Sequence, residues 1–321
     1  MRNKPILIVG GEPFGIFLEI FFKTISLKKF KNPIMLIASK KLLMKQMKIF
    51  NYNFKINLIN KDKINLNNLN KKTINIIDVN FNFKKPFDKM SSKSNSYIEK
   101  SFKIALQIIK KNSFSGIING PISKKNFLKE KYFGITEYLA DKTNSNNKVA
   151  MLIYNKKLSV SPITTHLPLK LVNKSLSKKK IINQVILIKD FYKKKFNINP
   201  KIGITGLNPH CESNYKSSEE KKIIIPAIKY LKKKTFNVSG PFPADTIFMK
   251  DNLKKFDCIV GMYHDQVLTP IKTIFDFNAI NITLGLPFVR ISPDHGPNEK
   301  MMGKNQSNPT SLVQAINFLD K

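Results

Sequence analysis

Four histidines are the residues of this chain whose type and placement best suit chemistry, namely His166, His210, His264 and His295. Each stands in a loop-like polar segment, and none lies on a regular apolar helix face. Three imidazoles that meet from different strand ends bind a divalent cation and leave positions open for a substrate. The gaps of 44 and 54 residues between the first three match no local zinc-finger signature. Spacing alone therefore leaves two interpretations open: a shared metal site, or histidines that each brace their own loop.

Short apolar runs that alternate with helical patterns predict the elements that must position these histidines. Strands are expected at 6–9, 34–37, 74–79, 116–118, 149–154, 158–163, 202–205, 258–262 and 280–284. The apolar spacing of Ile98, Phe102, Ala105 and Ile109 predicts a helix. Further helices are expected at 16–26, 175–194, 218–233 and 309–319. This alternation favours an α/β fold with a largely parallel sheet, in which ligands bind at the carboxyl ends of the strands.

The net charge of +35 raises the question of a nucleic-acid partner. Only two of the 56 basic residues are Arg, and the Lys residues are scattered along a chain that is also rich in Asn and Ile. A protein that reads nucleic acid usually relies on the bidentate fork of Arg. We therefore interpret the charge as a compositional bias on a solvated surface and expect no nucleic-acid partner. The positive charge can still attract anionic substrates.

Length and composition bound the architecture and the compartment. With 321 residues, 42% of them hydrophobic, the chain can form two lobes. The sequence contains no run of about 18 uncharged apolar residues, so we expect no membrane span. The first residues are expected to form a buried strand and a turn rather than a signal peptide. Two cysteines, Cys211 and Cys258, cannot form a disulfide framework, which suits a reducing cytoplasm.

The Asn- and Lys-rich stretch 51–95 is expected to be weakly constrained surface around one strand.

Seven segments of the chain recur in the order and with similar spacing found in a known protein family. Together they are far more specific than a lone glycine-rich turn. They are 120–124 (GPISK), 134–140 (GITEYLA), 164–169 (TTHLPL), 206–210 (GLNPH), 240–248 (GPFPADTIF), 262–266 (MYHDQ) and 281–290 (NITLGLPFVR). In these segments the chain resembles the 4-hydroxythreonine-4-phosphate dehydrogenase (PdxA) family, and the resemblance spans roughly residues 5–320.

The resemblance implies a two-lobed α/β/α fold like that of isocitrate and isopropylmalate dehydrogenases. It also implies a homodimer with its active site at the subunit interface. We expect residues 1–125 and 285–321 to form the cofactor-side lobe, and residues 126–284 to form the lobe for dimerisation, metal and substrate. The family's metal-binding histidines fall on His166, His210 and His264. Its substrate-binding positions fall on Ile135, Thr136, Lys272, Asn281 and Arg290.

The implied reaction is the oxidation of 4-(phosphooxy)-L-threonine to 2-amino-3-oxo-4-(phosphooxy)butanoate, in pyridoxal 5'-phosphate (vitamin B6) biosynthesis. One divalent metal ion per subunit (Zn, Co, Mn or Mg) would lower the pKa of the substrate hydroxyl while hydride leaves for NAD or NADP. The oxidised product is a β-keto acid, and its decarboxylation yields 3-amino-2-oxopropyl phosphate.

A phosphorylated substrate needs cations and directional donors. Lys272 supplies a point charge and Arg290 a planar fork, in a chain where Arg is rare. Thr136 and Asn281 would donate hydrogen bonds to phosphate oxygens. Lys124 either adds charge or is an ordinary surface lysine.

Two acidic residues lie inside the motifs, Asp245 and Asp265, and we count them with Lys272 as catalytic candidates. Each can orient a ligand or accept a proton. An alternative for Asp245 is the N-cap of a helix.

The chain departs from the family pattern at three places that matter. One follows the family's N-terminal turn, which is kept at residues 11–16 (GEPFGI): the family's next residues, GPE, are replaced by Phe17-Leu18-Glu19. Ile135 stands where the family has His, so one substrate contact is lost. In the cofactor-side segment 294–304 (DHGPNEKMMGK), the pattern is kept at Asp294, His295, Gly296 and Gly303. Pro297 in that segment restricts the preceding residue and removes a backbone donor.

These departures keep three functions open. The first is the vitamin B6 enzyme. The second is a related dehydrogenase of another 4-phosphorylated hydroxy acid, such as threonate or erythronate phosphate, which Ile135 keeps open. The third is a metal- and phosphate-binding homologue with weak turnover, should the altered cofactor loop fail.

Overall fold

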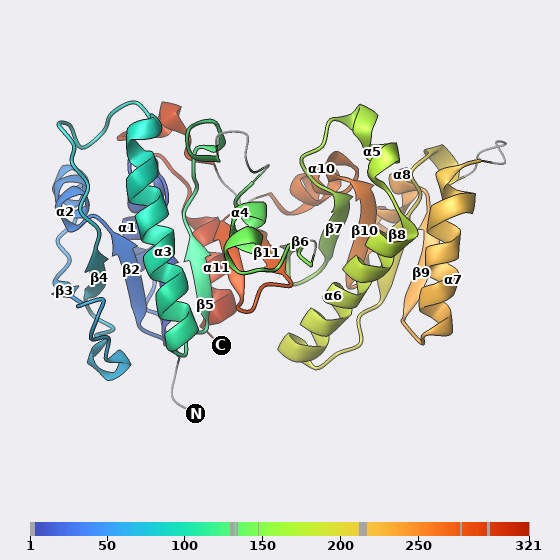
Figure 1. Ribbon diagram of the computed structural model, residues 1–321, viewed down its shortest axis with the longest axis horizontal. Helices are drawn as coiled ribbons and strands as arrows, with labels where there is room; N and C mark the ends of the chain where they lie inside the picture. The colour runs from blue at the N-terminus through green and yellow to red at the C-terminus, as the bar shows by residue number, and fades with distance from the viewer. Residues whose placement is uncertain are drawn as a thin grey trace. The chain divides into compact units, whose positions relative to one another are not determined.

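The chain folds into two compact units (Figure 1), and the computed structural model describes residues 4–128, 132, 134–146, 148–211, 217–276, 278–293 and 296–320, without the side chains of residues 124 and 125. Unit 1 comprises Met1–Ile135 and Phe288–Lys321, and unit 2 comprises Thr136–Pro287. The boundaries therefore fall ten and three residues later than the expected 125/126 and 284/285.

Unit 1 contains a parallel sheet with the strand order β3-β4-β2-β1-β5-β12. Its strands are β1 (Ile6–Val9), β2 (Ile34–Ala38), β3 (Ile56–Leu58), β4 (Ile74–Asp78), β5 (Gly116–Asn119) and β12 (Arg290–Pro293). Its helices are α1 (Phe17–Leu27), α2 (Lys40–Ile49), α3 (Asn95–Lys111) and α11 (Thr310–Leu319), with short turns η1 (Leu66–Asn68), η2 (Ser92–Ser94), η3 (Lys124–Leu128) and η6 (Glu299–Met301). Helix α3 packs against β1, β2 and β5. The central strands are buried on both faces, which explains their continuous runs of Ile, Leu and Val.

Unit 2 contains a mixed sheet with the order β11-β6-β7-β10-β8-β9. Its strands are β6 (Ala150–Tyr154), β7 (Ser159–Thr164), β8 (Ile202–Thr205), β9 (Val238–Phe242), β10 (Cys258–Tyr263) and β11 (Ile280–Leu284). Strand β6 runs antiparallel to β11 and β7, whereas β7, β10, β8 and β9 are parallel. The helices are α4 (Ile135–Lys142), α5 (Leu169–Ser175), α6 (Lys178–Phe196), α7 (Ile225–Lys233), α8 (Ala244–Ile247), α9 (Lys250–Leu253) and α10 (His264–Phe275), with turns η4 (Pro209–Cys211) and η5 (Glu220–Ile224).

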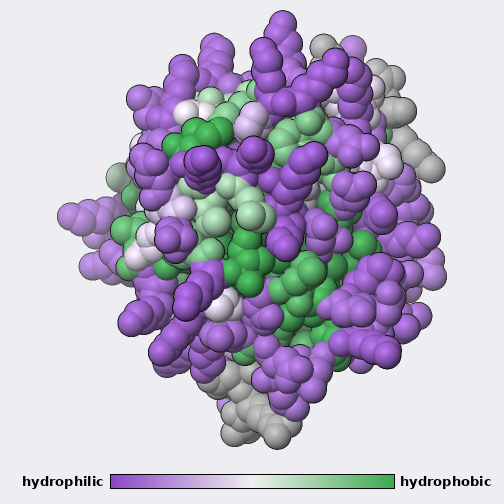
Figure 2. Space-filling view, turned by 90° about the vertical axis from the view of Figure 1, so that its left-hand side faces the viewer, coloured by the Kyte–Doolittle hydropathy of each residue, from purple (hydrophilic) through white to green (hydrophobic). Residues whose placement is uncertain are grey.

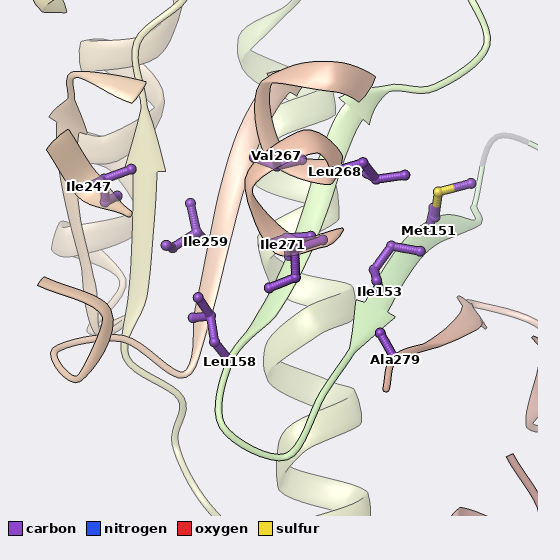
Figure 3. Close-up of a cluster of buried hydrophobic side chains, with 10 residues drawn as sticks. Met151, Ile153, Leu158, Ile247, Ile259, Val267, Leu268, Ile271 and Ala279 are labelled. Atoms are coloured by element: carbon purple, nitrogen blue, oxygen red, sulfur yellow. The ribbon is translucent and has the colours of Figure 1, made fainter. Parts of the chain in front are cut away.

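A buried apolar cluster holds helix α10 on the unit 2 sheet (Figure 3). Val267, Leu268 and Ile271 of α10 face Ile153 of β6 and Ile259 of β10. Full burial of such a side chain contributes about 1.5–3 kcal/mol. The cluster therefore fixes the helix whose first residue is His264.

The structure bears out the expected α/β class, and each of the nine predicted strands has a counterpart. Three strands were missed, namely β3, β9 and β12. The stretch 51–95 therefore holds two strands rather than one.

Hydrophilic residues are prominent on the surface. Figure 2 shows hydrophilic residues over most of the face it presents, around a hydrophobic area. Of the helices that the structure describes, none is both long and apolar enough to cross a membrane.

Candidate active site

The three candidate metal ligands follow the carboxyl ends of three adjacent parallel strands in unit 2. His166 lies two residues after β7, His264 directly follows β10, and His210 lies five residues after β8. Strand β10 pairs with β7 on one side and with β8 on the other. The order β7-β10-β8 therefore brings to one edge of the sheet three segments that are far apart in sequence.

Two of these imidazoles are neighbours. The ring centroids of His166 and His264 lie 5.9 Å apart, with 39° between the ring planes. Imidazoles that share a metal ion at metal–nitrogen distances of about 2.1 Å have centroids roughly 5 Å apart. Within the described part of the chain, no group of three or more His, Cys, Asp or Glu side chains is placed to hold one ion. The structure thus pairs His166 with His264, and the participation of His210 stays a prediction.

Hydrogen bonds tie the ends of β7 and β10 together beside this pair. The hydroxyl of Thr164 donates to the carbonyl of Met262 over 2.8 Å, and Thr164 is buried. The Nδ1 of His264 lies 2.6 Å from Oδ1 of Asp265, whose side chain is 79% exposed. Asp265 is therefore within hydrogen-bond distance of the His264 ring, and its role in orienting that ring stays a prediction.

The His210 loop (residues 206–211) has an unusual backbone. His210 and Cys211 both have φ of 57°, in the left-handed region, which costs a residue other than Gly of order 1–3 kcal/mol. Glu220, buried at the start of η5, accepts hydrogen bonds from the backbone N–H groups of Leu207 (2.8 Å) and Asn208 (2.9 Å). Burial alone would raise the pKa of the Glu220 carboxyl, but these hydrogen bonds outweigh it and leave that pKa below its ordinary value.

Asp245 follows β9, the next parallel strand at the same edge. It is exposed and is the second residue of α8. Pro243 holds the N-cap position, without a side-chain capping bond, so the N-cap alternative for Asp245 is wrong. Lys272 is exposed in the last turn of α10.

The expected phosphate-binding residues are divided between the two units. In unit 2, the hydroxyls of Thr136 and Thr283 lie 3.4 Å apart, which places the start of α4 beside β11. Asn281 lies on the same side of β11 as Thr283, since side chains alternate along a strand. Ile135 is the first residue of α4 and is half-buried.

Arg290 lies in unit 1, at the start of β12, and is completely buried. Its Nε donates a 2.7 Å hydrogen bond to Oδ1 of Asn119 at the end of β5. Sequence reasoning missed Asn119. The signal that could have identified it is a lone amide at the end of an apolar strand, directly before the 120–124 motif.

In unit 1, the turn after β1 packs against two distant segments. Gly11 has φ of 73°, and a Cβ there would lie 2.5 Å from the carbonyl oxygen of Pro121. The N–H of Glu12 donates to that same carbonyl (2.9 Å), and the N–H of Ile16 donates to the carbonyl of Pro297 (3.2 Å). The turn at residues 11–16 thus contacts both the 120–124 segment and Pro297.

The expected cofactor residues are placed only in part. Gly296 is exposed, and Gly303 has φ of 76°, which favours Gly there. Asp294 and His295 lie outside the described residues, as does the side chain of Lys124.

Comparison with known proteins gives these segments a family. A family profile described as "Pyridoxal phosphate biosynthetic protein PdxA" matches residues 29–319. The 4-hydroxythreonine-4-phosphate dehydrogenase of Sulfurihydrogenibium sp. (strain YO3AOP1) is 38% identical over 97% of this chain and 96% of its own length. That of Aquifex aeolicus (strain VF5) is 33% identical over 99% and 98%.

Solved structures agree with these relatives. The 4-hydroxythreonine-4-phosphate dehydrogenase of Klebsiella pneumoniae is 27% identical with a TM-score of 0.83, covering 98% of both chains. A putative one of Salmonella typhimurium is 27% identical with a TM-score of 0.85, covering 99% of both. The chain therefore belongs to the PdxA family, the family of the 4-hydroxythreonine-4-phosphate dehydrogenases.

Proposed function

We propose that this protein is a metal-dependent, NAD-linked 4-hydroxythreonine-4-phosphate dehydrogenase of pyridoxal 5'-phosphate biosynthesis. It would oxidise 4-(phosphooxy)-L-threonine and release CO₂ from the β-keto acid that results. The observation that carries the proposal is the full-length similarity to enzymes of that name. The histidine segments at three adjacent strand ends of unit 2 supply the matching chemistry.

The donor set fits a divalent cation. His166 and His264 are spaced much as two ligands of one ion, and the His210 segment follows the neighbouring strand. Because Nδ1 of His264 faces the Asp265 carboxylate, its Nε2 is the nitrogen left for a cation, and the carboxylate would hold the ring in that orientation. A cation held there would act as a Lewis acid toward the substrate hydroxyl.

The residues of the chain would supply binding and proton transfer. By the family resemblance, Thr136, Lys272, Asn281 and Arg290 would bind the phosphate and carboxylate groups. Asp245 is exposed at the same sheet edge as the histidines, where it can accept the hydroxyl proton. The hydride would pass to the nicotinamide of NAD or NADP, bound by the glycine-containing segment near residues 296–303.

We also propose a homodimer, since the family resemblance places the active site between two subunits. Size-exclusion chromatography with light scattering would measure it, and a monomer that retains full activity would contradict it.

The activity test is spectrophotometric. The purified protein, 4-(phosphooxy)-L-threonine, NAD or NADP and a divalent metal ion should produce NADH or NADPH. Turnover on threonate 4-phosphate instead would favour the second function, which the loss of a histidine at Ile135 motivates. Tight metal binding without reduction of either cofactor on any such substrate would favour a binding protein.

The metal test uses His210. The variant His210→Ala should lose its bound metal ion, measured by elemental analysis and by titration of the metal-free protein with Co²⁺. Cys211→Ser, which alters the neighbouring thiol, is the matched control and should keep the ion. Equal metal content in His210→Ala and wild type would remove His210 from the site.

A further inference from the structure

The start of the His210 loop is held to the neighbouring strand end by a buried amide. Gln266 in the first turn of α10 accepts a hydrogen bond from the hydroxyl of Thr205 (2.9 Å) and donates one to the carbonyl of Gly206 (2.8 Å). Its Oε1 also accepts from the backbone N–H of Met262 (2.7 Å). The loop therefore begins at a position defined relative to β10 and α10.

The next two residues of the loop are held by one carboxylate. Oε1 of Glu220 accepts from the N–H groups of Leu207 and Asn208, and its Oε2 accepts from Nδ2 of Asn208 (2.8 Å). Glu220 is 1% exposed, so these hydrogen bonds, rather than water, stabilise the charge of its carboxylate. Charge-assisted bonds of this kind are about twice as strong as neutral ones. Pro209 follows and has no N–H to offer.

The loop needs such support because its tip is strained. Two consecutive residues, His210 and Cys211, adopt left-handed backbone conformations, and such strain persists only where the surroundings impose it. A histidine on a freely moving loop loses more conformational entropy when it binds an ion than a histidine on a loop that is already fixed.

We propose that Glu220 is the positioning residue for His210: its carboxylate fixes the loop backbone so that the imidazole is held ready for the ion that His166 and His264 bind. The inference rests on the proposed metal site. It assigns to Glu220 a role at a distance, through the backbone of Leu207 and Asn208.

The test compares Glu220→Gln with Glu219→Gln. Gln at 220 keeps one acceptor oxygen but turns a donor toward the amide of Asn208. Among the described residues of the loop, Glu219 accepts a hydrogen bond only from that amide (3.0 Å) and from no backbone N–H, so its variant is the matched control. Metal-free protein is titrated with Co²⁺, followed by visible absorption and calorimetry. Residues behind the ligands of a metal typically change affinity by about 10–100-fold, and we expect a weakening in that range for Glu220→Gln alone.

A second readout separates positioning from general damage. At saturating Co²⁺, kcat of Glu220→Gln should return close to the wild-type value, because every proposed ligand is still present. Wild-type Co²⁺ affinity in a folded Glu220→Gln would overturn the inference while leaving the metal site intact, provided His210→Ala loses the ion. A wild-type protein that binds no Co²⁺ would overturn both.

Asn208→Ala covers the case in which Glu220→Gln does not fold. It removes the side-chain bond to Glu220 and leaves the two backbone bonds, so Co²⁺ affinity should fall by a smaller factor than expected for Glu220→Gln. Unchanged affinity in Asn208→Ala, in the absence of a folded Glu220→Gln, would count against the inference.

Discussion

The buried guanidinium of Arg290 donates its Nε hydrogen to Oδ1 of Asn119 over 2.7 Å. The amide of Asn119 in turn donates to the carbonyl of Gly120 (2.8 Å), which fixes its orientation. Both residues lie in unit 1, where Arg290 pairs in register with Ile117 of β5. Asn119, at the end of β5, thus fixes the orientation of the Arg290 guanidinium.

We predict that Asn119→Ala weakens phosphate binding through Arg290. A hydrogen bond to a charged group is worth about 1.5–3 kcal/mol, so KM for the phosphorylated substrate should rise about 10-fold or more, with a smaller change in kcat. Steady-state kinetics would measure this. Asn112→Ala, at the half-buried C-cap of α3, is the control. A lower melting temperature with an unchanged KM would show that Asn119 serves the fold alone.

We predict that Glu12→Gln stabilises the protein at neutral and alkaline pH. Burial raises the pKa of the Glu12 carboxyl above its ordinary value, and neither carboxylate oxygen has a hydrogen-bond partner among the described residues to offset this. A raised carboxyl pKa favours the protonated form in the folded state. Wild-type stability should therefore fall as pH rises from the unfolded-state pKa through the folded-state pKa.

Urea unfolding at about pH 8 and about pH 4 measures this difference. The advantage of Glu12→Gln should be present at the higher pH and shrink at the lower one. Glu99→Gln, on the exposed side of α3, should behave as wild type at both. An advantage independent of pH would mean that ionisation of Glu12 is not its cause.

We predict that Ile135→His improves binding of the phosphorylated substrate. Ile135 begins α4, next to Thr136, at the position where the family resemblance implies a histidine. A restored hydrogen bond contributes about 0.5–1.5 kcal/mol, so KM should fall roughly two- to tenfold. Ile135→Leu is the control for size. Should KM be equal in all three proteins, position 135 does not contact the substrate.

The elements that the sequence predicted were those with an uninterrupted local signal. Strands such as β1 and β10 are short apolar runs buried on both faces. Strand β9 was missed because its sequence, VSGPF, holds Gly and Pro, which an edge strand tolerates. Helix α10 was missed because Pro270 lies inside it. Strand β12 was missed because it has four residues, one of them a buried Arg.

The sequence by itself determined which segments are candidates for chemistry and which family they belong to, since motifs and apolar runs are local patterns. Only the tertiary structure decided that β10 lies between β7 and β8, and so that His264 lies beside His166. It also joined Asn119 to Arg290 across 171 positions. Strand order and long-range hydrogen bonds follow from how helices and strands pack around a core, and no local spacing encodes that packing.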